Sequence, residues 1–161
     1  MKTKLKYTFI ALLAGFGLLQ LTNPDRTNPP VTPGHDLFAL NPPPPQVAAL
    51  MHAACFDCHS QETRWPWYSR IAPVSWLVAS DVKHGRAKLN FSDWPVTDPA
   101  RAARKFGSIS DVVDAAEMPP KKYTLIHADA DLSADQRKAI VAWAEAQVEI
   151  AKDHAAGAPP K

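Results

Sequence analysis

The chain has 161 residues, a length typical of a single domain, and 46% of them are hydrophobic, which is enough to form a buried core. It carries 18 basic and 16 acidic residues, and three of the lysines lie within the first six positions. The other 15 basic residues are therefore balanced by the 16 acidic ones. This composition does not indicate the clustered basic face of a nucleic-acid-binding protein, so we expect no nucleic-acid partner.

The N-terminus begins with a basic segment, Lys2 to Lys6, followed by an apolar run from about Phe9 to Leu21. This order is typical of an export signal. The run is shorter than the ~20 residues of a comfortable membrane span, and no clear small-residue cleavage site follows it. Residues 1–22 are predicted to be a signal peptide or an N-terminal membrane anchor, with a buried helix as the less favoured alternative. Either export outcome places the rest of the chain in the periplasm, soluble or held at the inner membrane.

Residues 23–45 are rich in proline and end in Pro42 to Pro45. Proline fixes φ and removes amide donors, so this segment is predicted to be a stiff, extended linker. The sequence allows it to hold a domain away from a membrane or to wrap the surface of that domain.

The helical pattern of the main domain starts at Gln46, where apolar residues recur at spacings of three and four. Capping and proline signals predict the remaining helices. The expected helices are residues 46 to the cysteines, Pro73 to about Gly85, Asp98 to Ala116 with a break near Gly107, and the Ser133–Gln136 capping box to about Ile150.

No segment shows the sustained two-residue alternation of a strand. The predicted fold is therefore all-α, with four or five helices. We expect the domain to cover residues 46–153 and to be followed by a flexible tail over residues 154–161.

The sequence Cys55-Phe56-Asp57-Cys58-His59 has the C-x-x-C-H pattern by which c-type haem is attached. Two thiols three residues apart lie on one side of a helical turn, where they can add to the two vinyl groups of haem. The adjacent His59 is then the proximal iron ligand. Cys55 and Cys58 are the only cysteines in the chain. One covalently attached haem c is the expected cofactor, and the four or five helices are expected to form a cytochrome c-like bundle around it.

A cysteine pair of this spacing has two other uses in proteins. A thioredoxin-like redox pair belongs near a βαβ pattern, which the sequence lacks. A zinc site requires four ligands, and His84 and His127 would have to supply the other two without finger-like spacing. The haem interpretation is favoured because it uses the adjacent His59 and agrees with an exported protein.

The sixth ligand of the iron is predicted to be Met118, which lies in the segment Glu117-Met118-Pro119-Pro120. The two prolines stiffen this loop and so can hold a weak thioether ligand in place. His84 and His127 are the rival ligands. Met51, on the helix before the cysteines, is expected to pack in the core instead.

The run from Cys58 to Ser69, followed by Ile71 to Trp76, resembles the bacterial haem-binding domain family of small monohaem c-type proteins. Further similar segments are Asp81-Val82, Gly85-Arg86, Leu89 to Ser92 with Trp94, and Met118-Pro119-Pro120. The resemblance covers most of residues 45–145. It implies covalent haem at Cys55 and Cys58 with His59 as an iron ligand, and it supports Met118 by position.

A haem pocket needs flat apolar walls and cations for the two propionates. Aromatic side chains can form the walls, and guanidinium groups can grip the carboxylates, although each arginine could equally be a solvated surface charge. The candidate wall residues are Trp65, Trp67, Tyr68 and Trp76, and the candidate propionate partners are Arg64, Arg70 and Arg86. Trp67, Tyr68, Arg64 and Arg86 are the expected cofactor contacts.

These features favour a monohaem c-type cytochrome-like protein that transfers single electrons outside the cytoplasm. It would be an electron carrier without catalytic residues, and it would dock transiently to redox partner proteins. An exchangeable sixth ligand would instead make the protein a haem-based sensor or a peroxidase-like enzyme. A structural zinc-binding module is a third possibility.

Overall fold

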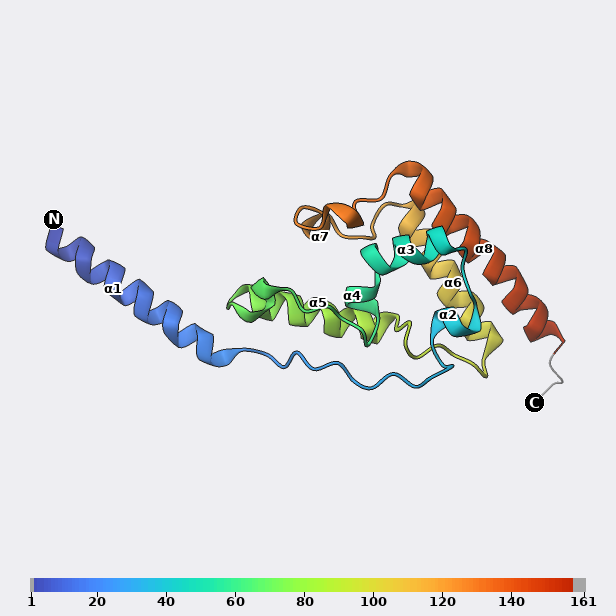
Figure 1. The fold of residues 1–161 in the computed structure, drawn as a ribbon, viewed down its shortest axis with the longest axis horizontal. Coiled ribbons are helices and arrows are strands. Elements are labelled where there is room, and N and C mark those ends of the chain that lie inside the picture. The colour runs from blue at the N-terminus through green and yellow to red at the C-terminus, as the bar shows by residue number, and fades with distance from the viewer. Residues whose placement is uncertain (1, 158–161) are drawn as a thin grey trace.

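The computed structural model describes residues 2–157, and over this range it contains eight α-helices and no strand, which confirms the all-α prediction (Figure 1). The longer helices are α1 (Lys2–Leu19), α3 (Pro45–Ala54), α5 (Val74–Lys88), α6 (Pro99–Asp114) and α8 (Ala134–Ala156). Single turns form α2 (Leu37–Leu40), α4 (Phe56–His59) and α7 (Lys121–Thr124), and the 3-10 helices are η1 (Gln20–Thr22), η2 (Trp67–Arg70) and η3 (Ala128–Ala130).

The start of α8 follows the capping signal in the sequence. The Ser133 hydroxyl accepts a bond from the amide of Gln136 at 3.2 Å, and the Gln136 side chain accepts one from the amide of Ser133 at 2.7 Å. The helix then continues to Ala156, past the predicted end at Ile150 and into the segment expected to be a flexible tail. Residues 158–161 of that predicted tail lie outside the described residues.

The predicted break near Gly107 is wrong, because α6 runs without interruption from Pro99 to Asp114. A glycine inside a helix costs about 0.5–1 kcal/mol relative to alanine. The helix also buries Phe106, Ile109 and Val113, and this packing offsets that cost.

The core lies between α6 and α8, which pack along each other, with α3 across them (Figure 1). The Phe106 ring meets Trp143 edge-on at a centroid distance of 5.6 Å and Trp94 at 4.7 Å. Met51 is fully buried in the same cluster and is therefore a packing residue.

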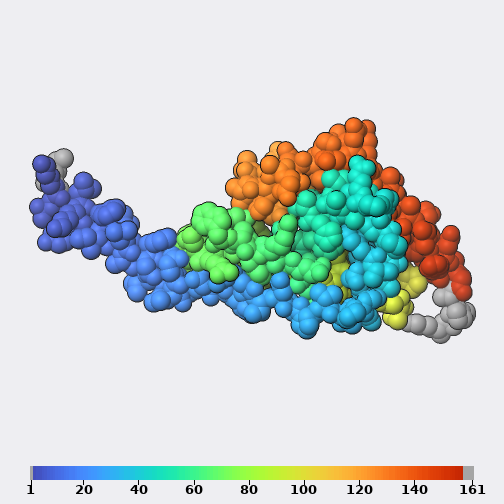
Figure 2. All heavy atoms as spheres, in the orientation of Figure 1, coloured from blue at the N-terminus to red at the C-terminus, as the bar shows by residue number. Residues whose placement is uncertain are grey.

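The proline-rich segment wraps the domain rather than holding it at a distance, and Figure 2 shows it along one edge of the molecule. The amide of Leu37 bonds to the carbonyl of Phe91 at 2.7 Å, and the amide of Trp94 bonds to the carbonyl of His35 at 2.9 Å. The segment also contains α2, which the linker prediction missed. Asp36 caps this turn by accepting a bond from Ala39, and Leu37 is fully buried.

Helix α1 projects from the domain and buries none of its residues (Figures 1 and 2). Together with η1 it spans Lys2–Thr22, and within the described residues it is the one helix long and apolar enough to cross a membrane. A signal sequence near the N-terminus has the same properties, so length and composition do not separate signal from anchor.

Candidate haem site

A cavity with a volume of about 870 Å³ lies among α4, α5, α6 and the segment after α6. Its volume falls in the range of about 300–1,000 Å³ that is usual for cofactor-sized ligands. The lining includes Cys55, Cys58, His59 and Met118, together with the apolar side chains Ala54, Leu89, Phe91, Ile109, Val112 and Val113.

The two cysteines reach this cavity because the chain makes a new helical turn at the end of α3. Cys55 leaves the helical conformation with φ of −127°, and its carbonyl accepts bonds from Cys58 at 3.2 Å and His59 at 3.0 Å. Both thiols are free and half-buried. Burial raises the pKa of Cys55 to about 12 and that of Cys58 to about 11, so both are protonated thiols at neutral pH.

Gly85 allows α5 to lie directly against this turn. A Cβ atom at Gly85 would overlap the carbonyl oxygen of Cys58 and would lie 3.0 Å from its carbonyl carbon. These are backbone atoms, which cannot move aside without shifting the turn. The close approach therefore requires glycine at position 85.

His59 is oriented by a bond from its ring to the backbone. Its Nδ1 atom lies 3.0 Å from the carbonyl oxygen of Leu89, which can only accept, so Nδ1 carries the proton. Burial lowers the pKa of His59, which favours the neutral ring. The lone pair is then on Nε2, the arrangement that an iron-ligating histidine needs.

Met118 is held by the C-terminal cap of α6. Ala116 adopts a left-handed conformation with φ of 54°, and its amide bonds to Val113 at 3.1 Å while that of Glu117 bonds to Val112 at 3.0 Å. This pair of bonds forms a Schellman motif. The amide of Met118 also bonds to the Val112 carbonyl at 3.1 Å, so the thioether segment is tied to the helix end.

The two rival ligands occupy different places. His84 lines the cavity, and its Nδ1 atom lies 2.7 Å from the carbonyl oxygen of Ser80. His127 does not line it; its Nε2 bonds to the Tyr68 hydroxyl at 3.0 Å, and its ring stacks on Tyr123 at 4.0 Å. Residues 2–157 contain no group of three or more His, Cys, Asp and Glu side chains placed to hold a metal ion, so the donor set does not fit a zinc site.

A basic group that sequence reasoning missed also lines the cavity: Lys88, Arg101, Arg104 and Lys105. Among the described ion pairs none involves these four residues, whereas Lys122, which also lines the cavity, pairs with Asp81 at 2.8 Å. Burial and the neighbouring Arg101 lower the pKa of Lys105. The helical spacing of Arg101, Arg104 and Lys105 could have identified this face, but the sequence does not show what the face meets.

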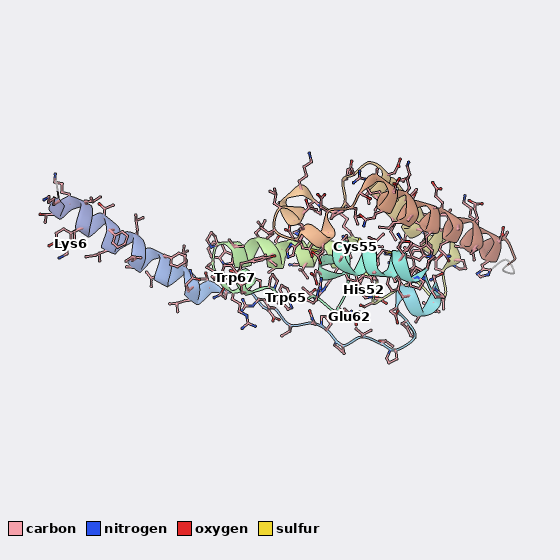
Figure 3. The ribbon with its side chains drawn as sticks, turned by 45° about the horizontal axis from the view of Figure 1, so that its top comes forward. Lys6, His52, Cys55, Glu62, Trp65 and Trp67 are labelled. Atoms are coloured by element: carbon pink, nitrogen blue, oxygen red, sulfur yellow. The ribbon has the colours of Figure 1, made fainter. Side chains whose placement is uncertain are left out.

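The aromatic and arginine residues predicted as cofactor contacts lie outside the cavity lining. Arg64 pairs with Asp57 at 3.2 Å, and Arg86 bonds to the carbonyl of Ser60 and the side chain of Asn28, both at 2.7 Å. Tyr68 bonds to His127, and Trp67 is 74% exposed (Figure 3). Arg64 therefore ties the loop after the C-x-x-C-H motif to the motif itself, and Arg86 ties that loop to the wrapping segment.

The geometry agrees with the comparisons to known proteins. Searches against curated proteins and against solved structures gave no match. A family described as the haem-binding domain matches residues 14–146, which is most of the chain and includes every cavity residue discussed above. The chain belongs to the haem-binding domain family.

Proposed function

We propose that the protein carries single electrons outside the cytoplasm on one haem c. The haem would be attached through Cys55 and Cys58, with His59 and Met118 as its axial ligands. The observation that carries this proposal is one cavity that gathers all four side chains from two distant segments. Iron held by histidine and methionine alternates between its ferric and ferrous states and has a raised reduction potential.

The residues around the cavity fit the parts of a haem. Apolar side chains of α6 and of the segment after α5 would exclude water from the ring, and His59 presents its Nε2 lone pair. The four cations Lys88, Arg101, Arg104 and Lys105 are the proposed partners of the two propionates. Guanidinium groups suit this role because each can donate two parallel bonds to a carboxylate.

We also propose that α1 remains attached as an anchor in the inner membrane, with the domain in the periplasm. Gln20 and the backbone of Ala72 exchange two hydrogen bonds at 2.9 and 3.3 Å, and the Trp76 indole donates to the carbonyl of Thr22 at 2.8 Å. Cleavage at the end of the apolar run would remove these contacts. Redox partners would then dock transiently to the domain beside the membrane, through small interfaces.

The optical spectrum of the exported protein, oxidised and reduced, tests the electron carrier. We expect a haem that survives acid extraction and a low-spin spectrum with a thioether-to-iron charge-transfer band. Met118→Ala should abolish that band and leave the haem attached, whereas His84→Ala, which changes the other candidate ligand on the cavity, should keep it.

Other spectra would point to other functions. A high-spin wild type that binds carbon monoxide quickly would favour a sensor or a peroxidase-like enzyme with an exchangeable sixth ligand. Loss of the haem on acid extraction would refute covalent attachment. Mass analysis of the mature N-terminus separates the anchored form from a cleaved one.

A further inference from the structure

An exposed apolar patch lies where α1 joins the domain. It consists of Trp67 from η2, Ile71 from the turn after it, and Val74, Trp76 and Leu77 from the first turn of α5. Their exposed fractions run from 37% for Ile71 to 74% for Trp67. Single exposed apolar residues are ordinary, but five within eleven positions concentrate exposed apolar surface in one segment, which is typical of an interaction site.

The patch is fixed to the end of the apolar helix by hydrogen bonds. Gln20 bonds in both directions to the backbone of Ala72, and the Trp76 indole bonds to Thr22. Arg26 donates to the carbonyl of Ser69 at 3.4 Å. Figure 3 shows Trp67 beside the end of α1 that meets the domain, with Lys6 near the opposite end of the helix.

The length of α1 brings the patch to the membrane surface. The apolar run from Phe9 to Leu21 is about 20 Å long as a helix, against a hydrocarbon thickness of about 30 Å. A helix that is short for the bilayer draws its flanking residues toward the interface. Lys2, Lys4 and Lys6 flank one end of this stretch, and the patch flanks the other.

The composition of the patch suits the membrane interface. Tryptophan is enriched at the level of the lipid headgroups, where its ring is buried and its N–H can still find a partner. Between residues 65 and 80 the only charged residue is Arg70, which is exposed and favours anionic headgroups. A protein partner would use the same apolar residues, but it would not account for their attachment to the end of α1.

We infer that the segment from Trp67 to Leu77 docks the domain against the outer surface of the membrane that α1 spans. This inference rests on the proposed anchor. It adds that the domain has a fixed position on the membrane surface. Docking would hold one face of the domain on the lipid, so that only the remaining faces would be open to redox partners.

Hydroxyl-radical footprinting of the full, haem-loaded chain tests this docking. The chain is placed in lipid nanodiscs of phosphatidylcholine and phosphatidylglycerol, and oxidation is read by mass spectrometry. The matched control carries a long Gly-Ser insertion between Thr22 and Asn23 together with Gln20→Ala and Trp76→Phe, which keeps the anchor and removes the side-chain bonds that fix the domain to its end. We expect Trp67 and Leu77 to be oxidised several-fold more slowly in the wild type than in the insertion variant.

The two internal references are Val96 in the loop before α6 and Ile150 on α8, which are 48% and 47% exposed. Figure 1 shows α6 and α8 on the side of the domain away from α1. Their oxidation should be equal in both proteins. Equal oxidation of Trp67 in both proteins would overturn the docking. It would not affect the proposed anchor or the proposed electron carrier. A mature chain that begins beyond Thr22 would overturn the anchor and the docking together, and would leave the electron carrier untouched.

Discussion

Tyr123 donates a hydrogen bond of 2.9 Å to the carboxylate of Asp57, which lies between the two cysteines of the C-x-x-C-H motif. Tyr123 belongs to α7 and lies five residues after Met118 in the chain. Its bond therefore joins the segment that follows Met118 to the turn that carries His59. Asp57 also accepts bonds from the backbone and side chain of Arg64 at 3.0 and 3.2 Å. The carboxylate therefore connects the two segments that supply the proposed iron ligands.

Tyr123→Phe should lower the free energy of unfolding by about 1–3 kcal/mol, because it leaves a largely buried carboxylate with one bond fewer. The ring that lines the cavity is kept, so haem attachment should persist. We expect the thioether band to be lost at a lower denaturant concentration than in the wild type. Denaturant titration followed in that band and by circular dichroism measures both effects.

Tyr68→Phe is the matched control for Tyr123→Phe. It removes a bond of 3.0 Å to the ring of His127, outside the lining of the cavity. Its effect on the thioether band should be small. If the two variants weakened that band equally, the bond between Tyr123 and Asp57 would have no special part in holding Met118.

Gly85→Ala should reduce the yield of attached haem and destabilise the fold, because the added Cβ would overlap the Cys58 carbonyl. Gly107→Ala is the opposite case, since a Cβ there meets nothing within 4 Å in the middle of α6. Filling that position should stabilise the protein by about 0.5–1 kcal/mol. Haem absorbance per protein and the midpoint of thermal unfolding test the pair, and full haem attachment in Gly85→Ala would contradict the close packing of α5 on the motif.

The sequence predicted the part of the site that is local. Cys55, Cys58 and His59 lie within five consecutive positions, so one helical turn suffices to bring them together, and the stiff loop at Met118 marked a segment held outside a helix. The roles of Arg64 and Arg86 depend on Asp57 and Asn28, which tertiary contacts supply. Conversely, the sequence alone gives no reason to distinguish the face of α6 that carries Arg101, Arg104 and Lys105 from an ordinary solvated helix face. Only the fold shows that this face lines the cavity. Gly107 shows that packing on α8 outweighs a local helix-breaking signal.

Ala116→Gly should stabilise the protein by about 0.5–1 kcal/mol, because it relieves an L-residue of the left-handed conformation required by the Schellman motif. Ala115→Gly is the control, since φ of −67° at this neighbour is an ordinary helical value and glycine there only adds flexibility. We expect thermal unfolding to move upward in the first variant and downward in the second. A downward shift in Ala116→Gly would mean that the cap does not carry this strain.

The pair of changes Arg101→Gln and Arg104→Gln should lower the reduction potential of the haem. The oxidised form carries one more positive charge than the reduced form, so nearby cations disfavour oxidation, and their removal favours it. The effect should diminish with added salt as the remaining charges are screened. Lys138→Gln on α8, where Lys138 is 78% exposed, removes a charge of the same sign from the solvated surface and should leave the potential nearly unchanged. Redox titrations of the three proteins at low and high ionic strength measure this, and equal potentials in all three would place the propionates away from the basic face of α6.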